Sequence, residues 1–162
     1  MSARSTRKPR TRSNVVLLVE DNENDILLFT RAFKAARTNS TLHVVRDGTE
    51  AVAYLTGQGK FADRNQYPLP DLMLLDRKMP RMDGFQVLQW ARRQPELTML
   101  CIVVLTTSDD LPDVNLAYEL GANSFLTKSG RLRDFTAQVT EIKKYWLGTT
   151  TTPDCLPPPA DT

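Results

Sequence analysis

The sequence predicts an α/β domain built on one parallel sheet with helices on both faces. Short apolar runs, such as residues 15–19 and 101–105, alternate with longer segments in which apolar residues recur at helical spacing. The runs are apolar throughout, which is typical of strands buried on both faces of a parallel sheet. With 162 residues, the chain has room for one domain of five strand–helix units.

The units follow one another along the chain. The first has a strand at residues 15–19 and a helix at residues 25–36, where Ile26, Phe29 and Phe33 gather on one helical face. The segment 57–70 is longer than a usual connection, and we interpret it as a surface loop that either contacts a partner or is a tolerated insertion. The other expected strands are residues 41–46, 71–75, 100–105 and 124–127, and the other expected helices are 50–55, 85–93, 111–120 and 132–147.

The two ends of the chain differ from this body. Residues 1–13 hold five basic residues and no acidic one, so the net charge of +2 conceals a mildly acidic body. Residues 148–162 are rich in Thr and Pro and show no periodicity. The sequence therefore predicts a disordered basic arm at 1–13, a folded domain at 14–147 and an extended tail at 148–162. We expect the arm to be solvated rather than bound to nucleic acid, because no aromatic residue is interleaved with its charges.

Composition excludes several classes of protein. No apolar run approaches the ~20 residues of a membrane span, and no apolar stretch follows the basic N-terminus as a secretory signal requires. Two cysteines and one histidine form neither a disulfide framework nor a zinc site. We therefore expect a cytoplasmic protein without membrane contact.

Polar side chains follow four of the predicted strands. Glu20 and Asp21 end the first, Asp76 the third, Thr106 the fourth and Lys128 the fifth. The carboxyl ends of parallel strands share one edge of a sheet, so these five residues should lie together, although each alone is ordinarily a turn residue or a solvated charge. Converging carboxylates repel one another unless a cation neutralises them, and an all-oxygen cluster suits Mg²⁺. The hydroxyl of Thr106 and the ammonium of Lys128 can donate hydrogen bonds to phosphoryl oxygens.

The motifs that hold these residues resemble the receiver domain of two-component response regulators over residues 14–147. The resemblance implies a flavodoxin-like, doubly wound sheet of five parallel strands in the order 2-1-3-4-5. The motifs are V-E-D-N at 19–22, L-D at 75–76, M-P at 79–80, D-G at 83–84, V-L-T-T at 104–107 and F-L-T-K at 125–128.

The resemblance also implies the roles of individual residues. Asp76 would accept a phosphoryl group, Thr106 and Lys128 would hold it, and Thr106 with the aromatic Phe125 would act as the switch. The protein would then be a phosphoacceptor that assists its own phosphorylation and dephosphorylation, not an enzyme. The residues implied to hold Mg²⁺, with Mn²⁺ as a substitute, are Asp21, Asp76 and the backbone carbonyl of Lys78, with Glu20 holding the ion through water.

A narrower resemblance, to single-domain regulators paired with bacterial phytochromes, involves the insert at 57–70, the Lys128–Ser129 pair and the Y-W-L ending at 145–147. It implies a sensor histidine kinase, in particular a bacteriophytochrome, as the partner. The donor histidine must belong to that partner, because His43, in the second predicted strand, is the only histidine of the chain. Proline usually follows the lysine in receivers, so Ser129 predicts either strain or a different local path.

Three other functions fit the residues less well. A phosphatase with an aspartyl intermediate usually has a second acid two residues after the nucleophile, where this chain has Lys78. A nucleotide-binding enzyme would have a glycine-rich phosphate loop, and the sequence contains neither of the two common forms. A degenerate receiver that only binds partners would not need the complete set of five polar residues.

The predicted helix at 111–120 has two apolar sides. Leu116, Ala117 and Leu120 are expected to face the sheet. Only 15 residues follow Leu147, so we expect no attached output domain and a signal that leaves through the receiver surface. A second apolar stripe suggests a symmetric homodimer built on this helix and the strand with Phe125, although arms formed by the tail are an alternative. The stripe consists of Leu111, Val114 and Tyr118.

Overall fold

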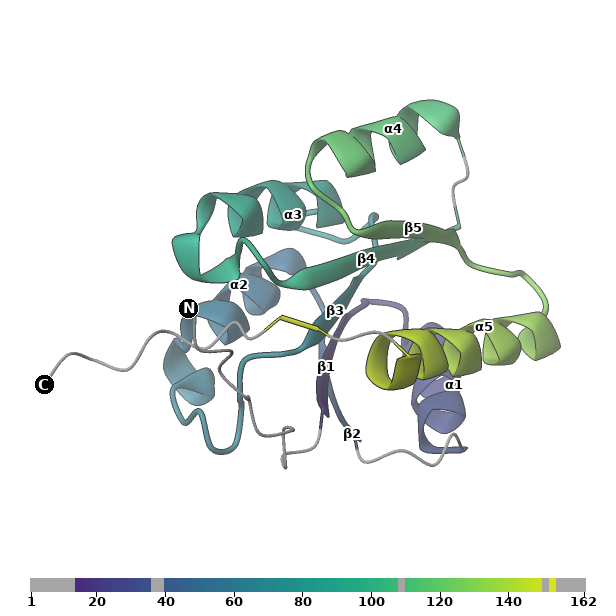
Figure 1. Cartoon of the computed structure of the whole chain (residues 1–162), viewed down its shortest axis with the longest axis horizontal. Coiled ribbons are helices and arrows are strands. Elements are labelled where there is room, and N and C mark those ends of the chain that lie inside the picture. Colours follow the sequence, from purple (N-terminus) through teal and green to yellow (C-terminus); the bar gives the residue numbers. More distant parts are fainter. Residues whose placement is uncertain (1–13, 36–39, 108–109, 150–151, 154–162) are drawn as a thin grey trace, which may run out of the picture.

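The fold is a five-stranded parallel sheet between two layers of helices, as a computed structural model describes for residues 14–35, 40–107, 110–149 and 152–153 (Figure 1). The strand order is β2-β1-β3-β4-β5, which confirms the expected fold class. The expected basic arm at 1–13 and most of the expected tail lie outside the described residues. The strands are β1 Asn14–Val19, β2 Ser40–Val45, β3 Leu72–Leu75, β4 Cys101–Thr106 and β5 Ser124–Thr127.

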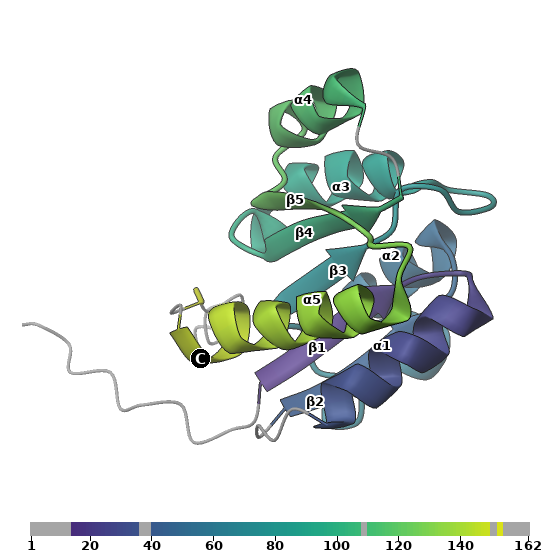
Figure 2. The same cartoon turned by 90° about the vertical axis from the view of Figure 1, so that its right-hand side faces the viewer.

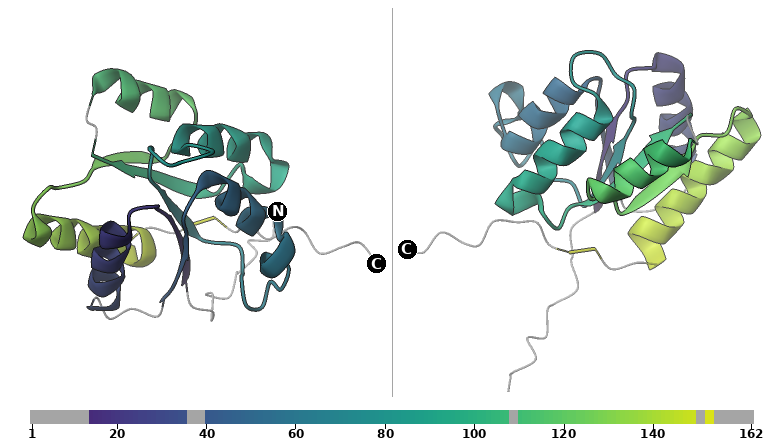
Figure 3. Two further views of the ribbon diagram at one scale, coloured as in Figure 1. Left: turned by 180° about the vertical axis from the view of Figure 1, so that it is seen from behind. Right: turned by 90° about the horizontal axis from the view of Figure 1, so that it is seen from above.

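The helices lie in two groups on opposite faces of the sheet (Figures 1 and 3). Helices α1 and α5 pack against one face, and helices α2, α3 and α4 pack against the opposite face. None of the described helices is long and apolar enough to cross a membrane. The helices are α1 Glu23–Ala35, α2 Gly48–Thr56, α3 Gly84–Arg93, α4 Leu111–Glu119 and α5 Leu132–Lys144, with short helical turns at Gly59–Phe61, Pro95–Leu97 and Tyr145–Thr149.

Alternate residues of the central strands supply the two halves of the core. Leu17 and Val19 of β1 face α2 and α3, whereas Val16 and Leu18 face α1 and α5. The three central strands are buried along their whole length apart from Asn14, which explains why their sequences are apolar rather than alternating. This packing fixes the register of the strands and therefore the positions of the residues that follow them.

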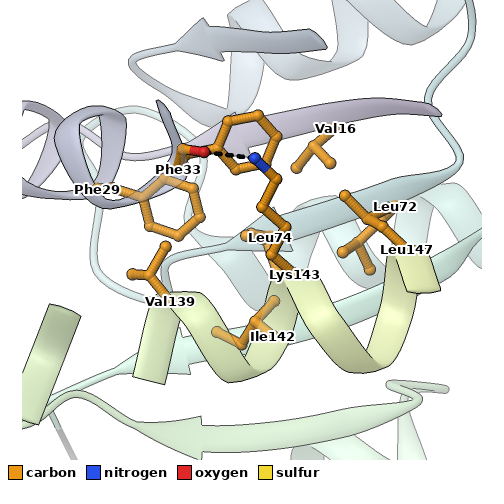
Figure 4. A pocket seen from close by; sticks show the side chains of 9 residues that line it. All are labelled: Val16, Phe29, Phe33, Leu72, Leu74, Val139, Ile142, Lys143 and Leu147. Atoms are coloured by element: carbon orange, nitrogen blue, oxygen red, sulfur yellow. Dashed lines mark hydrogen bonds between the residues drawn. The ribbon is translucent and has the colours of Figure 1, made fainter. Parts of the chain in front are cut away.

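A buried lysine joins the ends of α1 and α5. Figure 4 shows the Lys143 side chain among apolar residues of β1, β3, α1 and α5. Its ammonium donates a hydrogen bond to the carbonyl of Phe33 and lies 4.0 Å from the centre of the Phe33 ring. Burial lowers the pKa of Lys143. The predicted helix at 132–147 is regular only to Lys144, and its last residues form the turn Tyr145–Thr149.

The segment 57–70 lies on the surface, as expected, but its aromatic side chains pack on the domain. Phe61 is buried, and the rings of Tyr54, Phe61 and Tyr67 lie 5.1–6.0 Å apart. The Arg64 guanidinium donates hydrogen bonds to the carbonyls of Tyr54 and Leu55 at the end of α2. Both carbonyls lie in the last turn of α2, where helical partners are lacking, and that of Tyr54 also accepts from the N–H of Gly57, so Arg64 adds to the cap of α2.

The orientation of α4 differs from the expectation. Ala117 is buried and Leu120 half-buried, but Leu116 is 39% exposed, so the prediction that Leu116 faces the sheet is wrong. The helix is rotated so that Asp113, Ala117 and Leu120 lie on the inner side at the spacing of one helical face. On this side Ala117 packs in the core and Asp113 forms an ion pair with Arg77, a residue of the loop after β3, and both contacts favour this rotation.

Candidate functional site

Three carboxylates meet at the carboxyl ends of β1 and β3. Glu20 and Asp21 follow β1, Asp76 follows β3, and the loops they begin leave the sheet on the same side (Figure 2). Oxygen atoms of all three side chains lie within 4.8 Å of one another. The prediction that these residues share one edge of the sheet is confirmed. A donor set of carboxylate oxygens alone fits a hard divalent cation such as Mg²⁺ or Mn²⁺.

The cluster is buried to different depths. Glu20 and Asp76 are 3% and 8% exposed, whereas Asp21 is exposed. Burial raises the pKa of Asp76 to about 7, the charge of Glu20 adds to this effect, and the nearby Lys128 opposes it. Asp76 is therefore a carboxyl group that the fold holds close to its titration point at neutral pH.

Lys128, which follows β5, brings a buried positive charge to the same place. Its ammonium lies 2.5 Å from Oε2 of Glu20, 3.1 Å from Oδ2 of Asp25 and 3.5 Å from Oδ1 of Asp76. Burial alone would lower the pKa of Lys128, but the carboxylates outweigh it and the pKa is raised. Sequence reasoning missed Asp25. Its position four residues after Asp21, about one helical turn, could have indicated that the two side chains lie on the same side of the start of the helix.

The backbone on both sides of Lys128 is held by hydrogen bonds. The Lys128 N–H donates to the carbonyl of Thr106 over 2.7 Å. The side-chain amide of Gln138 accepts from the N–H of Ser129 over 2.9 Å and donates to the carbonyl of Thr127 over 2.7 Å. A proline at position 129 would have no N–H for this contact. The described chain has no cis peptide bond.

The loop after β3 brings α3 and α4 close to the cluster. Gly84 begins α3 against the backbone of Asp76, where a Cβ would lie 2.2 Å from the Asp76 carbonyl oxygen, so only glycine fits. Arg77 pairs with Asp113 of α4 and stacks 4.8 Å from the centre of the Phe85 ring. A groove of about 380 Å³ beside the cluster is lined by Asp21, Arg77, Lys78, Met79 and Asp83.

The remaining predicted site residues lie around the cluster rather than in it. Lys78 is exposed in the groove that Asp21 also lines. Thr106 is buried at the end of β4. Phe125 of β5 is half-buried, and its N–H donates a hydrogen bond to the hydroxyl of Tyr118 on α4. The switch role of Thr106 and Phe125 stays a prediction.

The chain is similar in sequence and in fold to known proteins. The family profile of the response regulator receiver domain matches residues 16–140. Response regulator Rcp1 from Synechocystis sp. is 40% identical over 86% of this chain and 92% of the relative. The solved Mn²⁺-bound form of Rcp1 superposes with a TM-score of 0.81 over 87% of this chain and 99% of that one.

Two further solved structures are similar. The phosphorylated cyanobacterial phytochrome response regulator RcpA is 37% identical, with a TM-score of 0.83 over 88% of this chain and 99% of that one. The bacteriophytochrome response regulator RtBRR is 34% identical, with a TM-score of 0.69 over 91% of this chain and 85% of that one.

The raised pKa of Asp76 should make stability depend on pH in the absence of divalent cations. Because the folded-state pKa of about 7 lies above the ordinary 3.8, the native state binds more protons than the unfolded chain between these values. The contribution of Asp76 to the free energy of unfolding therefore falls as pH rises from 4 to 7. Above pH 7, Asp76→Asn should be more stable than the wild type by roughly 1–3 kcal/mol.

Urea unfolding with a chelator present, at intervals from pH 4 to pH 8, measures this difference. At pH 4 the variant and the wild type should be equally stable, because the native carboxyl is then neutral. Glu141→Gln, which removes an exposed carboxylate of α5, is the control and should show no such trend. A difference for Asp76→Asn that is the same at every pH would contradict the assignment.

Proposed function

Because the chain belongs to the response regulator receiver family, we propose that Asp76 is the residue that accepts a phosphoryl group, and that a phosphohistidine of a sensor histidine kinase donates it. The main support is the position of Asp76. It is a buried carboxylate between two other acids and 3.5 Å from the Lys128 ammonium, at the carboxyl edge of the sheet.

In the proposed reaction, a carboxylate oxygen of Asp76 attacks phosphorus. A bond between oxygen and phosphorus forms, the bond between phosphorus and the imidazole nitrogen breaks, and the imidazole keeps the electron pair. Lys128 and the hydroxyl of Thr106 would bind the phosphoryl oxygens. Glu20, Asp21, Asp76 and the carbonyl of Lys78 would hold a Mg²⁺ or Mn²⁺ ion, which would neutralise negative charge on the carboxylates and the phosphoryl group.

We further propose that the protein is a phosphoacceptor that assists its own phosphorylation and dephosphorylation, without turning over a separate substrate. Lys78 supports this reading. A phosphatase with an aspartyl intermediate usually has an acid at that position, whereas Lys78 is an exposed base beside the groove.

A bacteriophytochrome is the kinase that we propose as the donor. Two of the similar structures are described as a phytochrome and a bacteriophytochrome response regulator, at 37% and 34% identity. The narrower sequence features, including Ser129 after Lys128, are consistent with this assignment. We propose that the transfer takes place in the cytoplasm.

Phosphorylation tests the assignment of Asp76. With a small-molecule phosphodonor and Mg²⁺, the wild type should gain one phosphoryl group, as intact-mass spectrometry detects, and a chelator should prevent the gain. Asp76→Asn should gain none, because an amide is not a nucleophile of this kind, while the nearly isosteric side chain leaves the fold intact.

Asp63→Asn, which changes an exposed aspartate of the segment 57–70 that does not belong to the cluster, is the matched control and should react like the wild type. The assignment fails if Asp76→Asn still gains a phosphoryl group. In a second arm, purified bacteriophytochrome kinase should transfer to the wild type faster than an unrelated histidine kinase does. Equal rates would argue against that partner.

We also propose a symmetric homodimer that uses α4 and β5. Leu111 and Tyr118 of the expected stripe are 68% and 49% exposed, and Leu116 adds to the apolar surface, whereas Val114 is half-buried. An exposed apolar surface of this kind is typical of a protein contact. Phosphorylation would modulate the dimer through Thr106 and Phe125, and the tail remains the alternative contact.

Sedimentation velocity tests this interface. The wild type should sediment as a dimer, and the double variant Leu111→Asp, Leu116→Asp as a monomer, because a charged carboxylate is costly to bury in an interface. Leu27→Asp, at a residue of α1 that is 48% exposed on the other side of the sheet, is the control and should remain dimeric. If all three proteins sediment as one species, this interface is wrong.

A further inference from the structure

We infer that Asp25 is a positioning residue for Lys128, and that it holds the lysine ammonium when a divalent cation is bound by the neighbouring acids. This inference rests on the metal site of the proposed function. It concerns a residue of α1 that the sequence motifs do not include, and it assigns Asp25 no contact with the cation itself.

The three carboxylates around Lys128 are not equivalent. Glu20 and Asp76 belong to the group of acids whose oxygens could hold a cation, together with Asp21. Asp25 lies outside that group, although its Oδ2 is 3.1 Å from the Lys128 ammonium. Lys128 therefore shares two of its three acidic partners with the cation site, and Asp25 is the one it does not share.

A cation at that site and the Lys128 ammonium would repel each other and compete for Glu20 and Asp76. The Lys128 side chain is only 6% exposed, so it has little access to water as a substitute partner. Among the described residues, Asp25 is the only acid outside the cation site that forms an ion pair with Lys128. Asp25 thus lowers the cost of drawing the ammonium away from the acids that bind the cation.

The carboxylate of Asp25 is well placed for this role because its backbone is fixed. The Asp25 N–H donates a hydrogen bond to Oδ1 of Asn22 at the start of α1. A purely local role is the alternative, since an acid in the first turn also stabilises the helix dipole. Glu23 is in the same turn and pairs with Arg46 on the surface, away from Lys128, so it separates the two roles.

Mn²⁺ binding, measured by calorimetry, tests the inference through a double-mutant cycle. The proteins are the wild type, Asp25→Asn, Lys128→Met and the double variant, with Glu23→Gln as the matched control. Asp25→Asn should weaken Mn²⁺ binding about fivefold when Lys128 is present and less than about twofold when position 128 is Met. Glu23→Gln should change the affinity less than about twofold.

The same loss of affinity in both backgrounds would mean that Asp25 acts only as a nearby charge, and would overturn the inference. No loss, or tighter binding, in Asp25→Asn would also overturn it. Thermal unfolding checks that each protein is folded, and Asp25→Ser, a second uncharged residue that can accept a hydrogen bond, repeats the test if the first variant unfolds. If the wild type binds no Mn²⁺, the proposed metal site fails; if it binds and the cycle shows no coupling, only the inference fails.

Discussion

A buried ammonium among converging carboxylates is the interaction on which the site depends. Parallel strands place the acids after β1 and β3 at one edge, and the apolar packing of the sheet allows them little room to move apart. Lys128 offsets part of this negative charge within 3.5 Å of Glu20, Asp25 and Asp76. Removing one partner of such a buried ion pair is costly, because the charges that remain are left uncompensated.

The same charges are linked to a surface helix. Arg77 directly follows Asp76 and pairs with Asp113 on the inner side of α4, while the hydroxyl of Tyr118 on the same helix accepts a hydrogen bond from Phe125 of β5. The ion pair therefore connects the residue that follows Asp76 to the helix that carries exposed apolar residues.

The sequence predicted the parts of the molecule that local patterns determine. Apolar runs identified the three central strands, the alternation of strands and helices identified the two edge strands, and the polar residues after the strands identified Glu20, Asp21, Asp76 and Lys128 as neighbours. What the sequence missed were side-chain contacts that hydrophobic patterns do not reveal. Arg77 pairs with Asp113 on the side of α4 that faces the core, and Leu116 is exposed instead. Phe61 packs on the rings of Tyr54 and Tyr67. Asp25 was missed because a first-turn acid is common in helices for other reasons.

The free energy of unfolding of Lys128→Met at neutral pH, with and without Mg²⁺, tests the central role of the ammonium most directly. Without divalent cations the variant should be less stable than the wild type by about 2–4 kcal/mol, because buried carboxylates lose their counter-ion. Saturating Mg²⁺ should reduce this difference in stability to a small fraction of its value without divalent cations, because the bound cation replaces the missing counter-ion. Lys60→Met, which removes the exposed partner of Glu50, should cost less than about 0.5 kcal/mol under both conditions. A Lys128→Met variant as stable as the wild type without divalent cations would contradict the account.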